Sequence, residues 1–189
     1  ILIASHKLLK MQMSKLNFKM KIKILDVENI FKSKVDNKQI NLINVNYNSS
    51  KAFEPISSKS NAYINNCFKI ALKIIKKNNL KRLVTGPISK KYFLKKKYLG
   101  ITEYISKKLA VRKNAMLIYN KKLSVCPVTT HMPLKNVAKK IDKKLIIDKV
   151  RLINDFYINN FKSKPKIGVL GINPHCESID KFNEDDKIL

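Results

Sequence analysis

The sequence predicts an α/β fold with a largely parallel sheet. The first observation is that short apolar runs alternate along the chain with longer segments whose apolar residues recur at helical spacing. Such alternation is typical of strand–helix–strand units with parallel strands. The second is that the chain passes three times from an apolar run through a short polar turn into a helical pattern. The third is length, because 189 residues suffice for one sizeable domain, or two small ones, with a buried core.

Seven apolar runs have the length and composition of strands. In chain order they are residues 1–4, 22–27, 40–45, 82–84, 115–119, 123–128 and 166–170. Residues 44–59 show no clear periodicity, and we expect a surface loop there. The sequence contains no internal repeat and no low-complexity linker.

Two long segments have the spacing of amphipathic helices. In residues 57–79 one face is apolar and most lysines lie off it; that face carries Cys67, Ile70, Ala71, Ile74 and Ile75. Residues 142–160 carry a second stripe, formed by Ile146, Val150, Ile153 and Tyr157. Shorter helices are expected after three turn residues, Pro87, Gly100 and Pro133.

The charge is strongly positive, with 40 basic against 13 acidic residues and a formal net charge of +27. All but three of the basic residues are lysine, and lysine, asparagine and isoleucine, whose codons are A/T-rich, dominate the chain. A nucleic-acid surface usually relies on arginine for bidentate contacts. We therefore interpret the charge as a lysine-covered solvent face with no specific nucleic-acid partner, and keep a basic nucleic-acid-binding module as an alternative.

Composition also limits compartment and partners. Three cysteines, Cys67, Cys126 and Cys176, cannot form a disulfide framework and fit a reducing cytoplasm. No apolar run approaches the roughly 18–20 residues that a membrane span needs. The chain begins with Ile1 rather than Met and ends within a pattern typical of a first helical turn, so we expect a fragment of a longer protein.

The chemistry is expected at the three strand–turn–helix segments, residues 83–90, 125–134 and 167–177. In open α/β sheets ligands bind outside the carboxyl ends of the strands, so these turns could face one cleft. His131 and His175 lie at two of these strand ends, whereas His6 lies on a lysine-rich segment and is expected at the surface. Neutral imidazole is a common ligand of zinc and similar metals. We interpret His131 and His175 as metal ligands, with capping or structural histidines as the alternative.

The first of these turns contains Thr85-Gly86-Pro87 followed by Lys90. Lys90 would lie in the first helical turn and could meet an anionic substrate, or it could be one more solvated lysine. The sequence contains neither a G-x-G-x-x-G fingerprint nor a P-loop, so a Rossmann or P-loop nucleotide site is not supported.

Four segments, residues 85–90, 100–104, 129–134 and 171–175, occur in an order and spacing that together resemble the 4-hydroxythreonine-4-phosphate dehydrogenase family of pyridoxine biosynthesis. The resemblance extends over the whole chain. It implies that residues 1–189 are the N-terminal and central part of a two-lobed enzyme, without the family's opening segment and a large C-terminal portion. The chain alone is then an incomplete catalytic region, and we expect it to be inactive by itself.

The resemblance implies an isocitrate and isopropylmalate dehydrogenase-like α/β/α sandwich with a cleft between two lobes. It implies a homodimer whose active sites are shared between subunits. The implied reaction is the oxidation and decarboxylation of 4-phosphohydroxy-L-threonine to 3-amino-2-oxopropyl phosphate in pyridoxal 5'-phosphate synthesis. The implied cofactors are NAD or NADP and a divalent metal ion, zinc, magnesium or cobalt.

The resemblance also assigns residues. His131 and His175 correspond to metal ligands, and the third histidine ligand and the phosphate-binding residues fall outside this sequence. Thr102 corresponds to a substrate contact. Ile101 stands where the family has a substrate-contacting histidine, so the same chemistry on a related four-carbon sugar-acid phosphate is an alternative. No residue is assigned to the nicotinamide.

Overall fold

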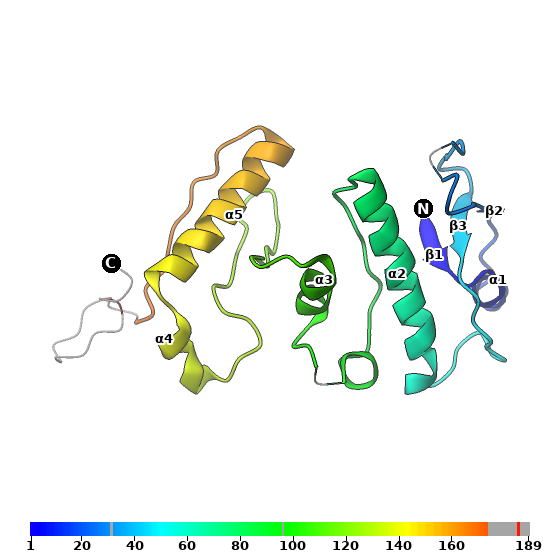
Figure 1. Ribbon diagram of the computed structural model, residues 1–189, viewed down its shortest axis with the longest axis horizontal. Helices are drawn as coiled ribbons and strands as arrows, with labels where there is room; N and C mark the ends of the chain where they lie inside the picture. Colours follow the sequence, from blue (N-terminus) through cyan, green and yellow to red (C-terminus); the bar gives the residue numbers. More distant parts are fainter. Residues whose placement is uncertain (31, 96, 174–184, 186–189) are drawn as a thin grey trace. The chain divides into compact units, whose positions relative to one another are not determined.

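The computed structural model describes residues 1–30, 32–95, 97–173 and 185. The chain divides into two compact units, Ile1–Tyr98 and Leu99–Leu189, and each unit is described by itself. Figure 1 follows the chain through both units and labels their helices and strands.

The first unit is built on a parallel three-stranded sheet. Its strands are β1 (Leu2–Ala4), β2 (Ile22–Ile24) and β3 (Ile40–Asn44), in the order β1-β3-β2. Leu42 of β3 pairs with Leu2 on one side and with Ile24 on the other, and it is fully buried. The parallel sheet that the sequence predicts is therefore confirmed in this unit.

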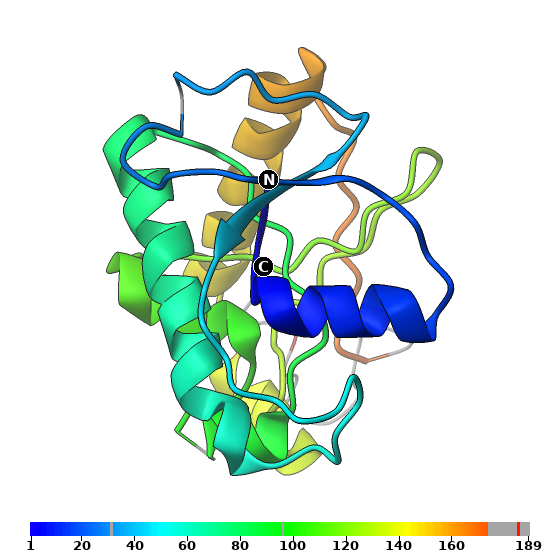
Figure 2. The same cartoon turned by 90° about the vertical axis from the view of Figure 1, so that its right-hand side faces the viewer.

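Two helices lie on either side of these strands (Figure 1). Helix α1 (His6–Lys15) begins at Ser5, whose hydroxyl accepts a hydrogen bond from the Leu8 N–H at 3.3 Å. Helix α2 (Asn61–Asn78) follows a short 3-10 turn and ends at Asn79, which adopts a left-handed backbone. In Figure 2, α1 runs across the view and α2 runs from top to bottom.

The core of the first unit lies between the sheet and α2. It contains Leu25, Ile30 and Ile43 together with Ile74 of α2, and Ile3, Val27 and Ile70 pack against it. The predicted apolar face of α2 is confirmed in Ala71 and Ile74, which are buried. The predicted loop over residues 44–59 is also confirmed up to the 3-10 turn Ser58–Ser60.

The second unit is mainly helical in its described part. It contains α3 (Ile101–Leu109), α4 (Val137–Lys140) and α5 (Lys143–Phe161). Helix α5 begins at Asp142, whose carboxylate accepts from the Leu145 N–H at 2.7 Å, which confirms the predicted second long helix. Lys149 of α5 donates to the carbonyl oxygen of Asn114 at 2.6 Å, and an aromatic group packs at the end of the helix: Tyr119, Phe156, Tyr157 and Phe161.

The sequence predicts four strands after α2, and this prediction is wrong: none of the four segments forms a regular strand in the described chain. Over residues 82–84 and 166–170, which the structure describes, the backbone joins no hydrogen-bonded ladder. Residues 115–119 and 123–128 share a single antiparallel bridge, Ile118 with Val125. The physical reason is the missing partner: Val84 is 95% exposed and Leu170 is 92% exposed, so these apolar runs have no neighbouring strand within the described chain. A run with strand composition becomes a strand only when a second strand completes its ladder.

Two smaller differences have local causes. Strand β2 ends at Ile24 rather than near residue 27, because the Asp26 carboxylate accepts from the Glu28 N–H at 3.2 Å and turns the chain. Helix α1 was not among the predicted helices, since its lysines interrupt any apolar stripe and none of its residues is buried. In the described residues, no helix combines the length and the apolar character needed to cross a membrane.

Candidate functional site

The three turns expected to carry the chemistry fall in different units, so each is described where it lies. The turn with Thr85-Gly86-Pro87 belongs to the first unit and leads into a π-helical turn, Lys90–Leu94. Ser89 caps that turn, and its hydroxyl accepts from the Tyr92 N–H at 3.3 Å. Lys90 is exposed at the first position of the turn.

A hollow of about 280 Å³ lies beside this turn. Pro87, Ile88 and Ser89 line it together with Ser60 and Asn61 at the start of α2, whereas Lys90 does not. The expected contact of Lys90 with an anionic substrate stays a prediction.

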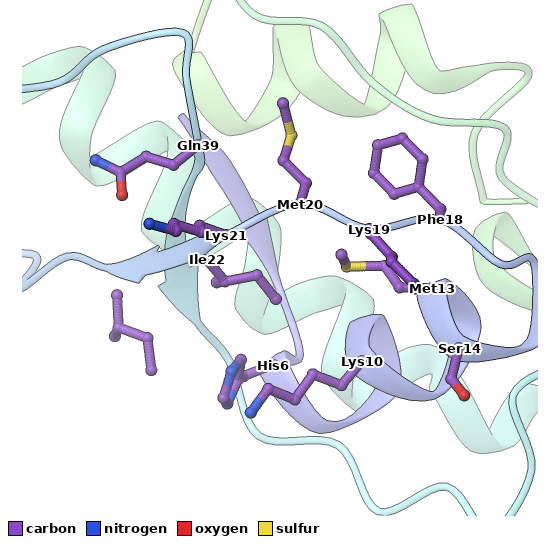
Figure 3. A pocket seen from close by; sticks show the side chains of 11 residues that line it. His6, Lys10, Met13, Ser14, Phe18, Lys19, Met20, Lys21, Ile22 and Gln39 are labelled. Atoms are coloured by element: carbon purple, nitrogen blue, oxygen red, sulfur yellow. The ribbon is translucent and has the colours of Figure 1, made fainter.

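A larger hollow of about 920 Å³ lies between α1 and the segment that leads into β2. Figure 3 shows His6 and Lys10 extending from α1, with Lys21 and Ile22 on the strand side. His6 is partly buried at the start of α1, so it is less exposed than the sequence suggested. None of the predicted site residues lines this hollow.

In the second unit, His131 occupies an unusual backbone conformation. Its φ of 55° lies in the left-handed region, which residues other than glycine rarely adopt. The 3-10 turn Leu134–Asn136 begins directly after Pro133, so the strained residue lies at the point where the chain turns toward a helix. Strain of this kind persists where the surrounding structure imposes it, and it is often found at functional sites. The side chain of His131 is exposed and thus available to a ligand.

Gly100 brings two of the four motif segments together. It caps the start of α3, and a β-carbon added to it would lie 3.3 Å from His131 Nε2 and 2.9 Å from Glu103 Oε2. An imidazole nitrogen and a carboxylate oxygen therefore border the same bare face of Gly100. The fold places the segment 100–104 beside the segment 129–134, although the two are distant in sequence.

Ile101 and Thr102 are the first two residues of α3 and are both partly buried. They share the first helical turn with Glu103, whose Oε2 is buried and has no hydrogen-bond partner among the described residues. The structure thus keeps Thr102 within the same turn as the group around Gly100. Glu103 belongs to the motif segment 100–104, but the sequence alone assigns it no role; its one signal is an acidic residue in a first helical turn.

His175 lies outside the described residues, as does Cys176. The residues just before them are held by Asp185, which sequence reasoning did not select. Its carboxylate accepts from the backbone N–H groups of Ile172 at 2.8 Å and Asn173 at 3.3 Å. The signal in the sequence was the acidic run 184–186, which was interpreted only as a helix start.

The residues around Gly100 have the chemistry of metal ligands, since zinc binds imidazole nitrogen and carboxylate oxygen. Glu103 Oε2 is also a buried acceptor to which no described residue donates, and such an atom can accept from a donor or bind a cation. Within the described ranges there is no cluster of three or more His, Cys, Asp or Glu side chains that could hold a metal ion. These residues therefore match the donor types of a metal site, and within the described ranges they number fewer than the three protein ligands usual in a catalytic zinc site.

The two described cysteines lie in surroundings that favour the neutral thiol over the nucleophilic thiolate. Burial raises the pKa of the Cys67 thiol and that of the Cys126 thiol, so both stay protonated at neutral pH. Cys67 lies on α2 next to Tyr63, whose pKa is raised by burial to about 12.

Comparison with known proteins gives a consistent result. The family model described as "Pyridoxal phosphate biosynthetic protein PdxA" matches residues 1–189. A 4-hydroxythreonine-4-phosphate dehydrogenase of Sulfurihydrogenibium sp. (strain YO3AOP1) is 36% identical over 154 residues, covering 79% of this chain and 47% of the relative. A protein of Oceanobacillus iheyensis, provisionally named a D-threonate 4-phosphate dehydrogenase, is 28% identical over 126 residues, covering 64% of this chain and 38% of the relative.

The fold is shared with solved structures. The crystal structure of a 4-hydroxythreonine-4-phosphate dehydrogenase from Burkholderia phymatum matches with a TM-score of 0.75 at 24% identity, over 92% of this chain and 53% of that chain. The predicted class, the α/β fold of the isocitrate dehydrogenase type, is thereby confirmed. The chain spans about half the length of the relatives it matches.

Proposed function

Because this chain belongs to the PdxA family, we propose that the protein carrying it oxidises and decarboxylates 4-phosphohydroxy-L-threonine to 3-amino-2-oxopropyl phosphate in pyridoxal 5'-phosphate synthesis. Relatives named dehydrogenases point to a nicotinamide cofactor, NAD or NADP. The proposal rests on one observation: the His131 side chain lies beside Gly100, at the start of α3. Two of the motif segments are therefore close together in the folded chain.

Each partner in the reaction has a stated task. A bound divalent metal ion supplies Lewis-acid stabilisation of negative charge on the substrate oxygen, which is worth several kcal/mol. The nicotinamide supplies the hydride acceptor. His131 offers an exposed imidazole as one metal ligand, and we assign His175 as a second. Thr102, in the first turn of α3, would donate its hydroxyl to the substrate and orient it.

Assembly and location follow the family resemblance. We propose a homodimer in the cytoplasm, with each active site completed by both subunits and the third metal ligand supplied by chain beyond residues 1–189. Light scattering on the protein carrying this sequence measures the dimer. A complementation experiment tests the shared site. One inactive variant is altered at His131 and the other at the third metal ligand, and a mixture of the two should recover activity if each site uses residues from both subunits.

A second substrate has one specific observation in its favour. Ile101 replaces a histidine that the family resemblance places against the substrate, and one relative is provisionally named for D-threonate 4-phosphate. The chemistry would be the same, with a hydroxy acid phosphate in place of the amino acid phosphate. Rates with both substrates separate the two proposals.

A basic nucleic-acid-binding module is the weaker candidate. Its support is the net charge of +27, yet only three basic residues are arginine and the family match covers the whole chain. Non-specific binding through lysine weakens steeply with salt. Fluorescence anisotropy with labelled duplexes of different sequence should show binding that is lost at moderate salt, with no sequence preference.

Three histidines allow a clean test of the enzyme proposal. In the protein carrying this sequence, His131→Ala and His175→Ala should each lower bound zinc and remove most nicotinamide reduction, whereas His6→Ala, in the first unit, should keep both. Zinc content by elemental analysis and the initial rate with either phosphorylated substrate are the measurements. Normal zinc content in one variant would remove that histidine from the ligand set. No turnover of either substrate with NAD or NADP in the unaltered protein would overturn the proposed function.

A further inference from the structure

The Oε2 oxygen of Glu103 is buried, and no described residue donates a hydrogen bond to it. Among the described residues only three buried side-chain polar atoms lack a hydrogen-bond partner, and Glu103 Oε2 is the one carboxylate oxygen among them. A buried carboxylate oxygen without a donor is costly, so native structures nearly always provide one. The donor should therefore be sought among the groups that lie next to this oxygen.

The neighbouring donor is the imidazole of His131. A β-carbon on Gly100 would lie 2.9 Å from Glu103 Oε2, 3.3 Å from His131 Nε2 and 3.5 Å from His131 Cδ2. The Nε2–Cδ2 edge of the ring therefore faces Gly100, beside which the Glu103 carboxylate also lies. Nδ1 is the ring atom opposite that edge, so it points away from Gly100. One ring nitrogen, Nε2, thus lies on the Gly100 side, and the other, Nδ1, lies on the opposite side of the ring.

The side chains of Glu103 and His131 both lie beside Gly100. Glu103 is fixed in the first turn of α3, which Gly100 begins. His131 is fixed by its left-handed backbone, with φ of 55°. Gly100 has no side chain, and a β-carbon there would lie within 3.3 Å of both the Glu103 oxygen and the His131 nitrogen.

We propose that Glu103 is a positioning residue for His131, accepting a hydrogen bond from Nε2–H and leaving the Nδ1 lone pair for a metal ion. The role in metal binding rests on the proposed function, whereas the hydrogen bond itself does not. Histidine ligands commonly donate their second ring N–H to a carboxylate, which fixes the ring and strengthens the ligand. Glu103 would supply that carboxylate from α3 to a ligand on a separate turn.

The hydrogen bond is measured first, without metal. In protein labelled with ¹⁵N-histidine, the Nε2–H proton of His131 should exchange slowly with water, compared with the ring protons of His6. Glu103→Leu should abolish that protection and Glu103→Gln should reduce it, because the amide oxygen still accepts but carries no charge. His131→Ala assigns the signal. Glu28→Gln, an exposed carboxylate in the first unit, is the matched control and should leave the signal unchanged.

Zinc is the second probe. We expect zinc to shift the Nδ1 resonance of His131 in the unaltered protein, and the Kd for zinc to rise about 10- to 100-fold in Glu103→Leu and less in Glu103→Gln. Thermal melting checks that each variant is folded, and the isosteric glutamine variant decides the question if the leucine variant does not fold.

The outcomes separate the two proposals. An unprotected Nε2–H in the unaltered protein, or equal protection and equal zinc Kd in all variants, would overturn the role of Glu103 while the proposed function stands. Zinc binding through Nε2 would also overturn it. A protected proton that Glu103→Leu removes, in a protein that binds no zinc, would support the hydrogen bond and contradict the metal dependence.

Discussion

The carboxylate of Asp185 accepts a hydrogen bond from the backbone N–H of Ile172 at 2.8 Å, and its second oxygen accepts from Asn173 at 3.3 Å. Asp185 is only 4% exposed, so these bonds form away from water. Two successive N–H groups held by one buried carboxylate fix the direction of the chain just before Pro174 and His175. The acidic residue thus connects the end of this sequence to the segment that carries a proposed metal ligand.

We predict that Asp185→Ala lowers the free energy of unfolding by about 1.5–3 kcal/mol, the usual worth of hydrogen bonds to a charged group. Asp185→Asn should lose less, because one oxygen can still accept. Urea unfolding at neutral pH gives both values. Asp155→Asn, an exposed aspartate on α5, is the control and should change little. If Asp185→Ala and Asp155→Asn unfold at the same urea midpoint, Asp185 does not hold the segment in solution.

Glu28 links the end of β2 to α2 by contacting Lys73 at 2.8 Å and Lys77 at 3.1 Å. Hydrogen bonds from these lysines lower the pKa of Glu28 from 4.5 to about 2. Because the pKa is lower in the folded state, the stabilisation is complete above about 4.5 and disappears as the pH falls toward about 2.

We therefore predict that Glu28→Gln destabilises the protein at neutral pH, and that the difference from the unaltered protein vanishes near pH 2. Added salt should also reduce the difference, since all three side chains are exposed. Chemical unfolding over a pH series measures it. In a Lys73→Met, Lys77→Met background the same substitution should show no such pH dependence. A difference that grows on acidification would contradict the prediction.

Gly100 is predicted to be needed for the arrangement of its neighbours more than for stability. In Gly100→Ala the new methyl group would lie 2.9 Å from Glu103 Oε2 and 3.3 Å from His131 Nε2, so these two side-chain ends must move. Alanine is also a poorer helix cap than glycine, at a cost of about 1 kcal/mol. We expect a small loss of stability with a clear loss of zinc affinity.

Gly168→Ala is the matched control, because a β-carbon there would meet nothing within 4 Å. Calorimetric zinc titration and urea unfolding on both variants give the two quantities. Unchanged zinc affinity in Gly100→Ala would show that the bare face of Gly100 is not part of the site.

Sequence-based prediction succeeded where a segment has a clear apolar periodicity and packs against an element close to it in the first or second unit. Strands β1, β2 and β3 and helices α2 and α5 follow from apolar periodicity, and Asp142 caps α5 close to the predicted start. Residues 82–84 and 166–170 have the composition of strands, but strand formation needs a second chain segment, which composition does not specify. Helix α1 rests on the Ser5 cap rather than on an apolar stripe.

The same limit applies to the site. His131 could be selected from its position after an apolar run, and Thr102 and Ile101 from the family resemblance. The closeness of Glu103 to His131 depends on a left-handed residue and on the bare face of Gly100, both of which are properties of the folded chain. The buried hydrogen bond between the Asp185 carboxylate and the Ile172 N–H likewise depends on packing. A run of acidic residues does not indicate which of its carboxylates is buried.

The last prediction concerns Ile101, which opens α3 between Gly100 and Thr102 and is partly buried. Isoleucine cannot donate a hydrogen bond, so we expect the contact that the family resemblance assigns to a histidine to be absent or replaced by another residue. A hydrogen bond to a charged group is worth about 1.5–3 kcal/mol, or roughly 10- to 150-fold in kcat/KM.

We predict that Ile101→His raises kcat/KM for 4-phosphohydroxy-L-threonine within this range and leaves zinc affinity unchanged, while the apolar control Ile101→Met changes neither. Steady-state kinetics with this substrate and with D-threonate 4-phosphate measure the effect. A fall for the first substrate would mean that the pocket is shaped around Ile101, and equal kinetics for both substrates in all three proteins would show that position 101 does not contact substrate.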